Sequence, residues 1–183
     1  MSPRVLRDPA EKRHPKFQAA KAGDVEAAEA LASHLASSVA VERLAGMLEG
    51  RLLPELVPIH ALETEGVNQI PAALANVLSR LLGLPVNASI VQLNSVGHTG
   101  ADGFKRLANQ ALFAGAVVQG ATYFVVDDFV GQGGTLANLI GFIRSQGGEV
   151  LGASVLTGKP YSAKLAPDEG QINALRHLAW ARA

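Results

Sequence analysis

Two adjacent acids, Asp127 and Asp128, are the residues of this chain whose surroundings are best suited to chemistry. Four apolar residues, 123–126, precede them in a run typical of a strand buried on both faces of a parallel sheet. A glycine-rich turn, 131–135, follows them, and the residues after it have apolar spacing suited to a helix. Two carboxylates at the end of a strand can hold a vicinal diol or, through water, a Mg²⁺ ion.

The turn after the acids is suited to binding phosphate. Glycines let backbone N–H groups approach a ligand without a Cβ in the way, and the N-terminus of the expected helix adds a partial positive charge. Thr135 can add a hydroxyl donor. A diol at one end and a phosphate at the other describe a ribose 5-phosphate. The candidate phosphate-binding residues are Gly131, Gln132, Gly133, Gly134 and Thr135.

Other interpretations of this turn fit less well. A P-loop requires a lysine after its last glycine, where this chain has Thr135. A dinucleotide fingerprint requires G-x-G-x-x-G, but its last position is Leu136 here, or Ala137 if one residue is skipped. A buried strand and tight turn with a purely structural role is the remaining alternative.

The stretch VVDDFVGQGGT, 125–135, resembles the phosphoribosyl pyrophosphate (PRPP) motif of the type I phosphoribosyltransferases. The resemblance implies that Asp127 and Asp128 bind the ribose hydroxyls and that the turn binds the 5′-phosphate. It also implies Mg²⁺ as the cofactor, with the acids as ligands through water, PRPP and a nucleobase as partners, and a homodimer. The family often has Thr where this chain has Gly131 and Gln132, so a side-chain hydroxyl is lost there.

The resemblance also places a pyrophosphate loop at 62–70, after a first core strand expected over Leu53–Ala61. Its candidate residues are Glu63, Thr64, Glu65 and Gly66. The loop has no Lys or Arg, and its two carboxylates would repel pyrophosphate unless Mg²⁺ or backbone N–H groups intervene. The alternative is a loop that no longer handles pyrophosphate.

Further site residues follow from the same resemblance. Lys105 and Arg106 lie where the family has a flexible loop that closes over PRPP; the alternative is a surface turn with solvated charges. Lys159 follows a strand expected over Glu149–Leu156 and is a candidate base-binding residue, as is Tyr161; the alternative is a pair of loop residues.

The composition excludes several classes of protein. Net charge is zero, with 16 basic and 16 acidic side chains, so nothing indicates binding to nucleic acid. There is no cysteine for a disulfide or a thiol nucleophile. No apolar run reaches the ~20 residues needed to span a bilayer, and the charged N-terminus has no apolar signal core. We expect a cytoplasmic protein that binds no membrane. The spacing of His60 and of the other histidines before and after it does not indicate a metal site.

The elements around the site predict an α/β fold. Strands alternate with helices over 53–156, which is typical of an open parallel sheet with helices on both faces, similar to the type I phosphoribosyltransferases. Further strands are expected over Asn87–Leu93 and, briefly, over Ala116–Val118. The helix before the last strand should end at Gly147 and Gly148.

Three regions are expected along the chain. Residues 1–50 form a helical N-terminal extension or hood, with little regular structure before Pro15 and with Asp24 capping a helix. Residues 51–160 form the phosphoribosyltransferase-like core, and 161–183 form a C-terminal loop and helix.

Two functions are compatible with these features. The first is a phosphoribosyltransferase that moves the 5-phosphoribosyl group from PRPP to a nitrogenous base and releases pyrophosphate. The alternative is a non-catalytic PRPP- or nucleotide-sensing regulatory protein on the same fold, which the acidic loop favours. A receiver-like phospho-acceptor domain is a weaker possibility, because such domains carry their acid pair after the first strand and this chain carries it after several elements.

Overall fold

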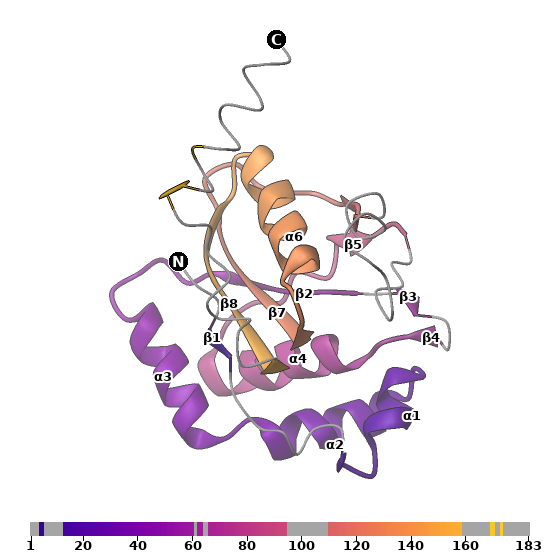
Figure 1. The fold of residues 1–183 in the computed structure, drawn as a ribbon. Helices are drawn as coiled ribbons and strands as arrows, with labels where there is room; N and C mark the ends of the chain where they lie inside the picture. The colour runs from indigo at the N-terminus through magenta and orange to yellow at the C-terminus, as the bar shows by residue number, and fades with distance from the viewer. Residues whose placement is uncertain are drawn as a thin grey trace.

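The computed structural model describes residues 4–5, 13–60, 62–63, 66–94, 110–158, 169–170 and 173. Its main sheet has the strand order β1-β8-β7-β2, and all neighbouring strands are parallel (Figure 1). These strands are β1 (Arg4–Val5), β2 (Glu55–Pro58), β7 (Thr122–Val130) and β8 (Glu149–Gly158).

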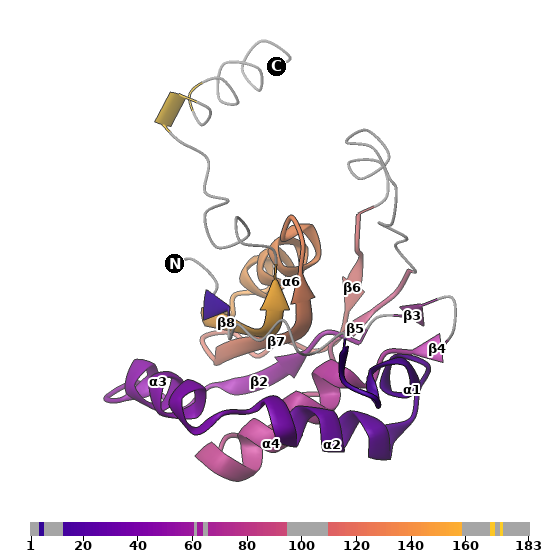
Figure 2. The ribbon, with the colours of Figure 1, turned by 60° about the horizontal axis from the view of Figure 1, so that its bottom comes forward.

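Helices cover both faces of this sheet (Figure 2). Alternate side chains of β7 point to opposite faces. Phe124 and Val126 therefore join one apolar cluster with the N-terminal helices and α4, whereas Tyr123 and Val125 join another with α6. The predicted α/β fold with a parallel sheet, helices on both faces and a helical N-terminal segment is confirmed. The helices are α1 (Phe17–Lys21), α2 (Val25–Leu35), α3 (Ser38–Leu48), α4 (Ile70–Leu82) and α6 (Gly134–Ser145).

Several helix boundaries agree with their sequence signals. The carboxylate of Asp24 accepts a hydrogen bond from the N–H of Ala27 at 2.9 Å and caps α2. Gly83 ends α4 in the left-handed conformation, with φ of 67°. α6 ends just before the glycine pair at Gly147. Among the described residues, no helix has both the length and the apolar character needed to cross a membrane.

The segment before Pro15, expected to have little regular structure, contributes a two-residue strand. Arg4 and Val5 form β1, which pairs with Ser154 and Val155 of β8. The edge of β8 offers unpaired backbone groups, and a two-residue strand satisfies some of them whatever its own propensity.

The expected strand over Asn87–Leu93 forms only β5 (Val91–Gln92), which pairs antiparallel with β6 (Phe113–Ala114) outside the main sheet. The prediction of a short strand over Ala116–Val118 was wrong, since these residues lie in no strand and β6 ends before them at Ala114. Gly115 separates the two, with φ of 142°, and a Cβ there would collide with the backbone around Ser89. This close approach to the preceding segment ends β6.

Candidate functional site

The acid pair lies inside β7 and not at its end, where it was expected. The strand continues to Val130, and Asp127 pairs with Val155 of β8. Asp127 and Asp128 are only 8% and 6% exposed. Buried carboxylates are unfavourable unless other groups pair with them, so their partners decide what this site can do.

Asp128 has two partners from distant parts of the chain. The side-chain amide of Asn68 donates to its Oδ2 at 2.9 Å, and Nζ of Lys21 lies 3.7 Å from the same oxygen. Asn68 is held in turn, because its Oδ1 accepts a hydrogen bond from the N–H of Ile70 at 3.2 Å. The carboxylate is therefore fixed by the start of α4 and by the end of α1.

The negative charge of Asp127 is less well compensated by its neighbours. Its Oδ1 accepts a hydrogen bond from the N–H of Asp128 at 2.9 Å. Burial, followed by the negative charge of Asp128, raises the pKa of Asp127 well above its ordinary value, although this hydrogen bond and the charge of Lys21 act in the opposite direction. A buried carboxyl group with a strongly perturbed pKa is typical of a functional site.

Asp127→Asn is expected to raise the free energy of unfolding at pH 7 and to leave it nearly unchanged near pH 3. Because the pKa of Asp127 is raised, the folded chain binds its proton more tightly than the unfolded chain. The parent protein therefore loses stability as the pH rises from 3.8, the ordinary value, through the folded pKa. Each unit of pKa corresponds to about 1.4 kcal/mol. Urea unfolding of both proteins across this pH range measures the difference, and a loss of stability at pH 7 would contradict it.

The glycine turn leads directly into α6, as predicted. Gly133 is the N-cap residue with φ of 79°, and no side chain caps the helix. Gly134 and Thr135 are the first helical residues, and such N–H groups have no partner inside a helix. The turn therefore presents backbone donors and the positive end of α6 a few residues after the acid pair.

The connections around the acid pair follow a pattern that is common at the ligand sites of open α/β sheets. β2 is followed by α4 on one face of the sheet, and its neighbour β7 is followed by α6 on the other (Figure 2). Adjacent parallel strands whose helices leave to opposite faces form a crevice at their carboxyl ends, where open α/β sheets bind ligands.

The segment proposed as the pyrophosphate loop is a small hairpin. β3 (Leu62–Glu63) pairs antiparallel with β4 (Gly66–Val67). Gly66 has φ of 140°, and a Cβ there would lie 2.7 Å from the carbonyl oxygen of Ala22. The loop is therefore packed closely against the chain between α1 and α2.

His60 follows the end of β2 and has an unusual environment. The N–H of Ile59, just before it, donates to the carbonyl of Val126 at 2.9 Å. Its Nε2 is buried and has no hydrogen-bond partner among the described residues. Burial lowers the pKa of His60, which favours the neutral imidazole.

The structure thus places Asp127, Asp128 and the turn 131–135 in succession along β7 and the start of α6. Asn68, which follows the hairpin of β3 and β4, contacts Asp128. The structure adds Asn68 and Lys21, which sequence reasoning missed. Asn68 lies within the predicted loop, so its amide was the one available signal; nothing local marks Lys21. The other predicted site residues lie outside the described residues: Thr64, Glu65, Lys105, Arg106, Lys159 and Tyr161.

A metal ion would have few protein ligands here. Within the described ranges, no group of three or more His, Asp or Glu side chains could hold one. Mg²⁺ commonly takes only one or two carboxylates and completes its shell with water and substrate phosphates. Asp127 and Asp128 fit that pattern as ligands through water.

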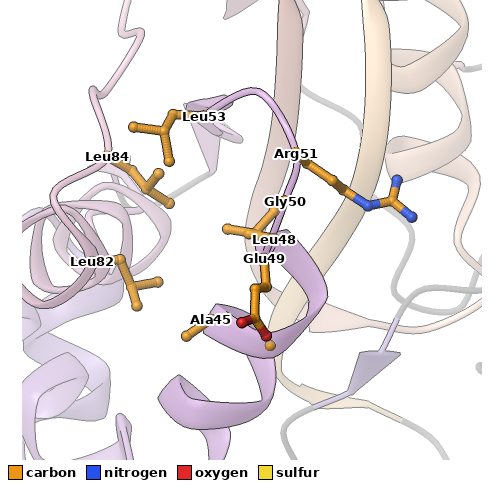
Figure 3. Close-up of a pocket in the computed structure, with 9 residues that line it drawn as sticks. Ala45, Leu48, Glu49, Gly50, Arg51, Leu53, Leu82 and Leu84 are labelled. Atoms are coloured by element: carbon orange, nitrogen blue, oxygen red, sulfur yellow. The ribbon is translucent and has the colours of Figure 1, made fainter.

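A pocket of about 450 Å³ lies away from the acids (Figure 3). It adjoins the chain just before β2, where Leu53 accepts a hydrogen bond from Thr122 at the first residue of β7. At about 3.3 Å per residue, Asp127 is more than 15 Å further along that strand. The pocket has few polar groups, and Figure 3 shows the guanidinium of Arg51 pointing away from the leucines. The lining residues are Ala45, Gly46, Leu48, Glu49, Gly50, Arg51, Leu53, Leu82 and Leu84.

Two curated proteins are similar to this chain in sequence. Protein TraN of Escherichia coli is 45% identical over 152 residues, which are 83% of this chain and 34% of TraN. An uncharacterized protein of Haemophilus influenzae is 44% identical over 130 residues, which are 71% of this chain and 29% of that protein. The chain therefore spans about a third of the length of these relatives. No family model matches the chain.

Among solved structures, the chain is similar to adenine phosphoribosyltransferase from Thermoanaerobacter pseudethanolicus, with a TM-score of 0.47 and 19% identity over 76% of this chain and 75% of that one. It is also similar to purine phosphoribosyltransferase from Pyrococcus horikoshii, with a TM-score of 0.45 and 21% identity over 70% of this chain and 76% of that one. Likenesses of this size assign no activity, and the function has to be argued from the acid pair, its partners and the glycine turn.

Proposed function

We propose that this chain binds PRPP and transfers its 5-phosphoribosyl group to a nitrogenous base, with release of pyrophosphate. The observation that carries the proposal is the order along β7 and α6: two buried acids, a glycine turn and a helix N-terminus without a side-chain cap. Carboxylates suit the two ribose hydroxyls as acceptors, and the helix N-terminus suits the 5′-phosphate.

In this reaction the base nitrogen forms a bond to C1 of the ribose as the bond from C1 to the pyrophosphate oxygen breaks. The transition state has the positive charge of an oxocarbenium ion, as in other glycosyl transfers. Asp127 and Asp128 orient the ribose from its hydroxyl edge, and the turn 131–135 fixes its other end. The contribution of the chain is therefore mostly positioning and electrostatic stabilisation.

Mg²⁺, when bound, neutralises charge on the leaving pyrophosphate. Asp127 and Asp128 would contact the ion through water. Its remaining ligands would be phosphate oxygens of PRPP and water.

A second function is binding of PRPP or a nucleotide without transfer. The contacts of Asp128 favour it, because this carboxylate already has a hydrogen bond from Asn68 and an ion pair with Lys21. A ribose hydroxyl would have to share or displace these partners. Such a protein would report ligand binding through α1 and the helical segment that follows it.

The two functions are separated by two measurements on the same protein. Calorimetric titration is expected to give micromolar affinity for PRPP that depends on Mg²⁺. A panel of purine and pyrimidine bases is then expected to include one that releases pyrophosphate from bound PRPP. Tight binding with no release by any base would favour the second function. Failure to bind PRPP, ribose 5-phosphate and nucleoside monophosphates would overturn both.

A further inference from the structure

The end of α1 reaches the acid pair. Lys21 is the last residue of this helix, and its Nζ lies 3.7 Å from Oδ2 of Asp128. The side chain of Lys21 is 26% exposed, so its ammonium borders the solvent at the site while the carboxylate behind it is buried. A residue of the N-terminal helical segment thus contributes a positive charge at the predicted ribose site.

α1 is also attached to the loop that follows β2. The N–H of Gln69 donates to the carbonyl oxygen of Ala20 at 3.2 Å. Gly66 lies so close to Ala22 that a Cβ would not fit between them. These two contacts involve the residues on either side of Lys21. The position of Lys21 beside the loop is therefore fixed by backbone contacts.

The ammonium of Lys21 also lies over an aromatic ring. Its Nζ lies 5.9 Å from the centre of the Phe17 ring, and Phe17 is buried in the core one turn earlier in α1. A cation over an aromatic face gains a modest attraction and loses conformational freedom. The ammonium is thus preorganised, which lowers the entropy cost of binding an anion.

Lys21 carries a positive charge that the loop after β2 lacks. The segment 62–70 contains Glu63 and Glu65 and no Lys or Arg. Pyrophosphate is strongly anionic and binds best to cations and N–H donors. In the described part of the chain, Lys21 is the basic residue that forms an ion pair with Asp128. The loop after β2 contacts Ala20 and Ala22, the residues on either side of Lys21.

We propose that Lys21 binds the pyrophosphate group of PRPP, in place of a basic residue in the loop itself. The inference rests on the proposed function and adds a specific ligand group to the N-terminal helical segment. An ammonium has three donors, so it can contact Asp128 and a phosphate oxygen together. Asp128 also keeps the hydrogen bond from Asn68 if Lys21 turns toward the ligand.

The test compares Lys21→Met with Lys16→Met by calorimetry on PRPP, inorganic pyrophosphate and ribose 5-phosphate, each with Mg²⁺. Lys16 is exposed and precedes the same helix, so its variant removes the same charge away from Asp128. Lys21→Met is expected to weaken PRPP and pyrophosphate binding by roughly tenfold to 100-fold, the range for a charged hydrogen bond. Ribose 5-phosphate affinity should change by less than about threefold in Lys16→Met, since a lost exposed charge has a small effect. In Lys21→Met it should fall by less than the affinity for PRPP does.

Lys21→Arg keeps the charge and is expected to bind pyrophosphate more tightly than Lys21→Met does. Circular dichroism of each variant checks that it is folded. An equal loss of affinity for all three ligands in Lys21→Met, or no loss for any of them, would overturn the role of Lys21. PRPP binding by the parent protein would still support the proposed function in that case. A parent protein that bound none of the ligands would overturn the proposed function, and the role of Lys21 with it.

Discussion

Replacing both carboxylates, by Asp127→Asn with Asp128→Asn, is expected to lower the affinity for PRPP by on the order of 100- to 10,000-fold. Each charge-assisted hydrogen bond to a ribose hydroxyl is worth about 1.5–3 kcal/mol, and two of them would be lost. Asparagine has nearly the same shape, and its oxygen can still accept the hydrogen bond that Asp127 now receives from the N–H of Asp128. Calorimetric titration of PRPP measures the loss, and circular dichroism checks the fold.

Two controls make this result specific. Glu149→Gln removes an exposed carboxylate from the opposite end of the sheet, at the first residue of β8, and should leave PRPP affinity unchanged. Inorganic phosphate should bind the double variant about as well as the parent, because the turn 131–135 is intact. PRPP binding that survived the double substitution would show that the acids do not hold the ribose.

The strand, turn and α6 could be predicted because their signals are local. The apolar run 123–126 is contiguous, Gly133 adopts the positive φ that glycine tolerates best, and the glycines after α6 end it. The end of β7 could not be predicted in the same way. Adjacent acids are unfavourable in a buried strand, and they remain in the ladder because β8 pairs with that segment and Asn68 and Lys21 compensate the charge of Asp128.

The partners of the acids were beyond sequence reasoning for a physical reason. Asn68 is 60 residues from Asp128, and Lys21 is further still. No periodicity links them, and their contacts depend on how α1 docks against the loop after β2. The N-terminal helices were expected to form an extension or hood. That expectation did not single out Lys21 as the residue that contacts Asp128.

The smallest strands were poorly predicted because pairing creates them. β5 and β6 have two residues each and exist as a ribbon that includes Val91 and Phe113. A segment with β-forming residues, such as Ala116–Val118, stays irregular when no partner strand lies beside it. The sequence therefore predicted the layers of the fold better than its shortest strands.

Gly133→Ala is expected to weaken binding of inorganic phosphate and of ribose 5-phosphate by at least roughly tenfold. Gly133 has φ of 79°, and an L-residue in this region costs about 1–2 kcal/mol. Part of that strain would be relieved by moving the turn, which reorients the N–H groups of Gly134 and Thr135 that are proposed to hold the phosphate. A cradle of backbone donors depends on their positions, so its affinity falls even though no side chain is lost.

The matched control is Gly141→Ala in the same helix. Gly141 is exposed, and a Cβ there would meet nothing within 4 Å, so alanine should stabilise α6 by about 0.5–1 kcal/mol without affecting phosphate binding. Urea unfolding and phosphate titration of both variants separate the two effects. If Gly133→Ala lost stability and still bound phosphate as the parent does, the conformation of the turn would matter for folding alone. The phosphate would then have to be held elsewhere, and the assignment of residues 131–135 would be wrong.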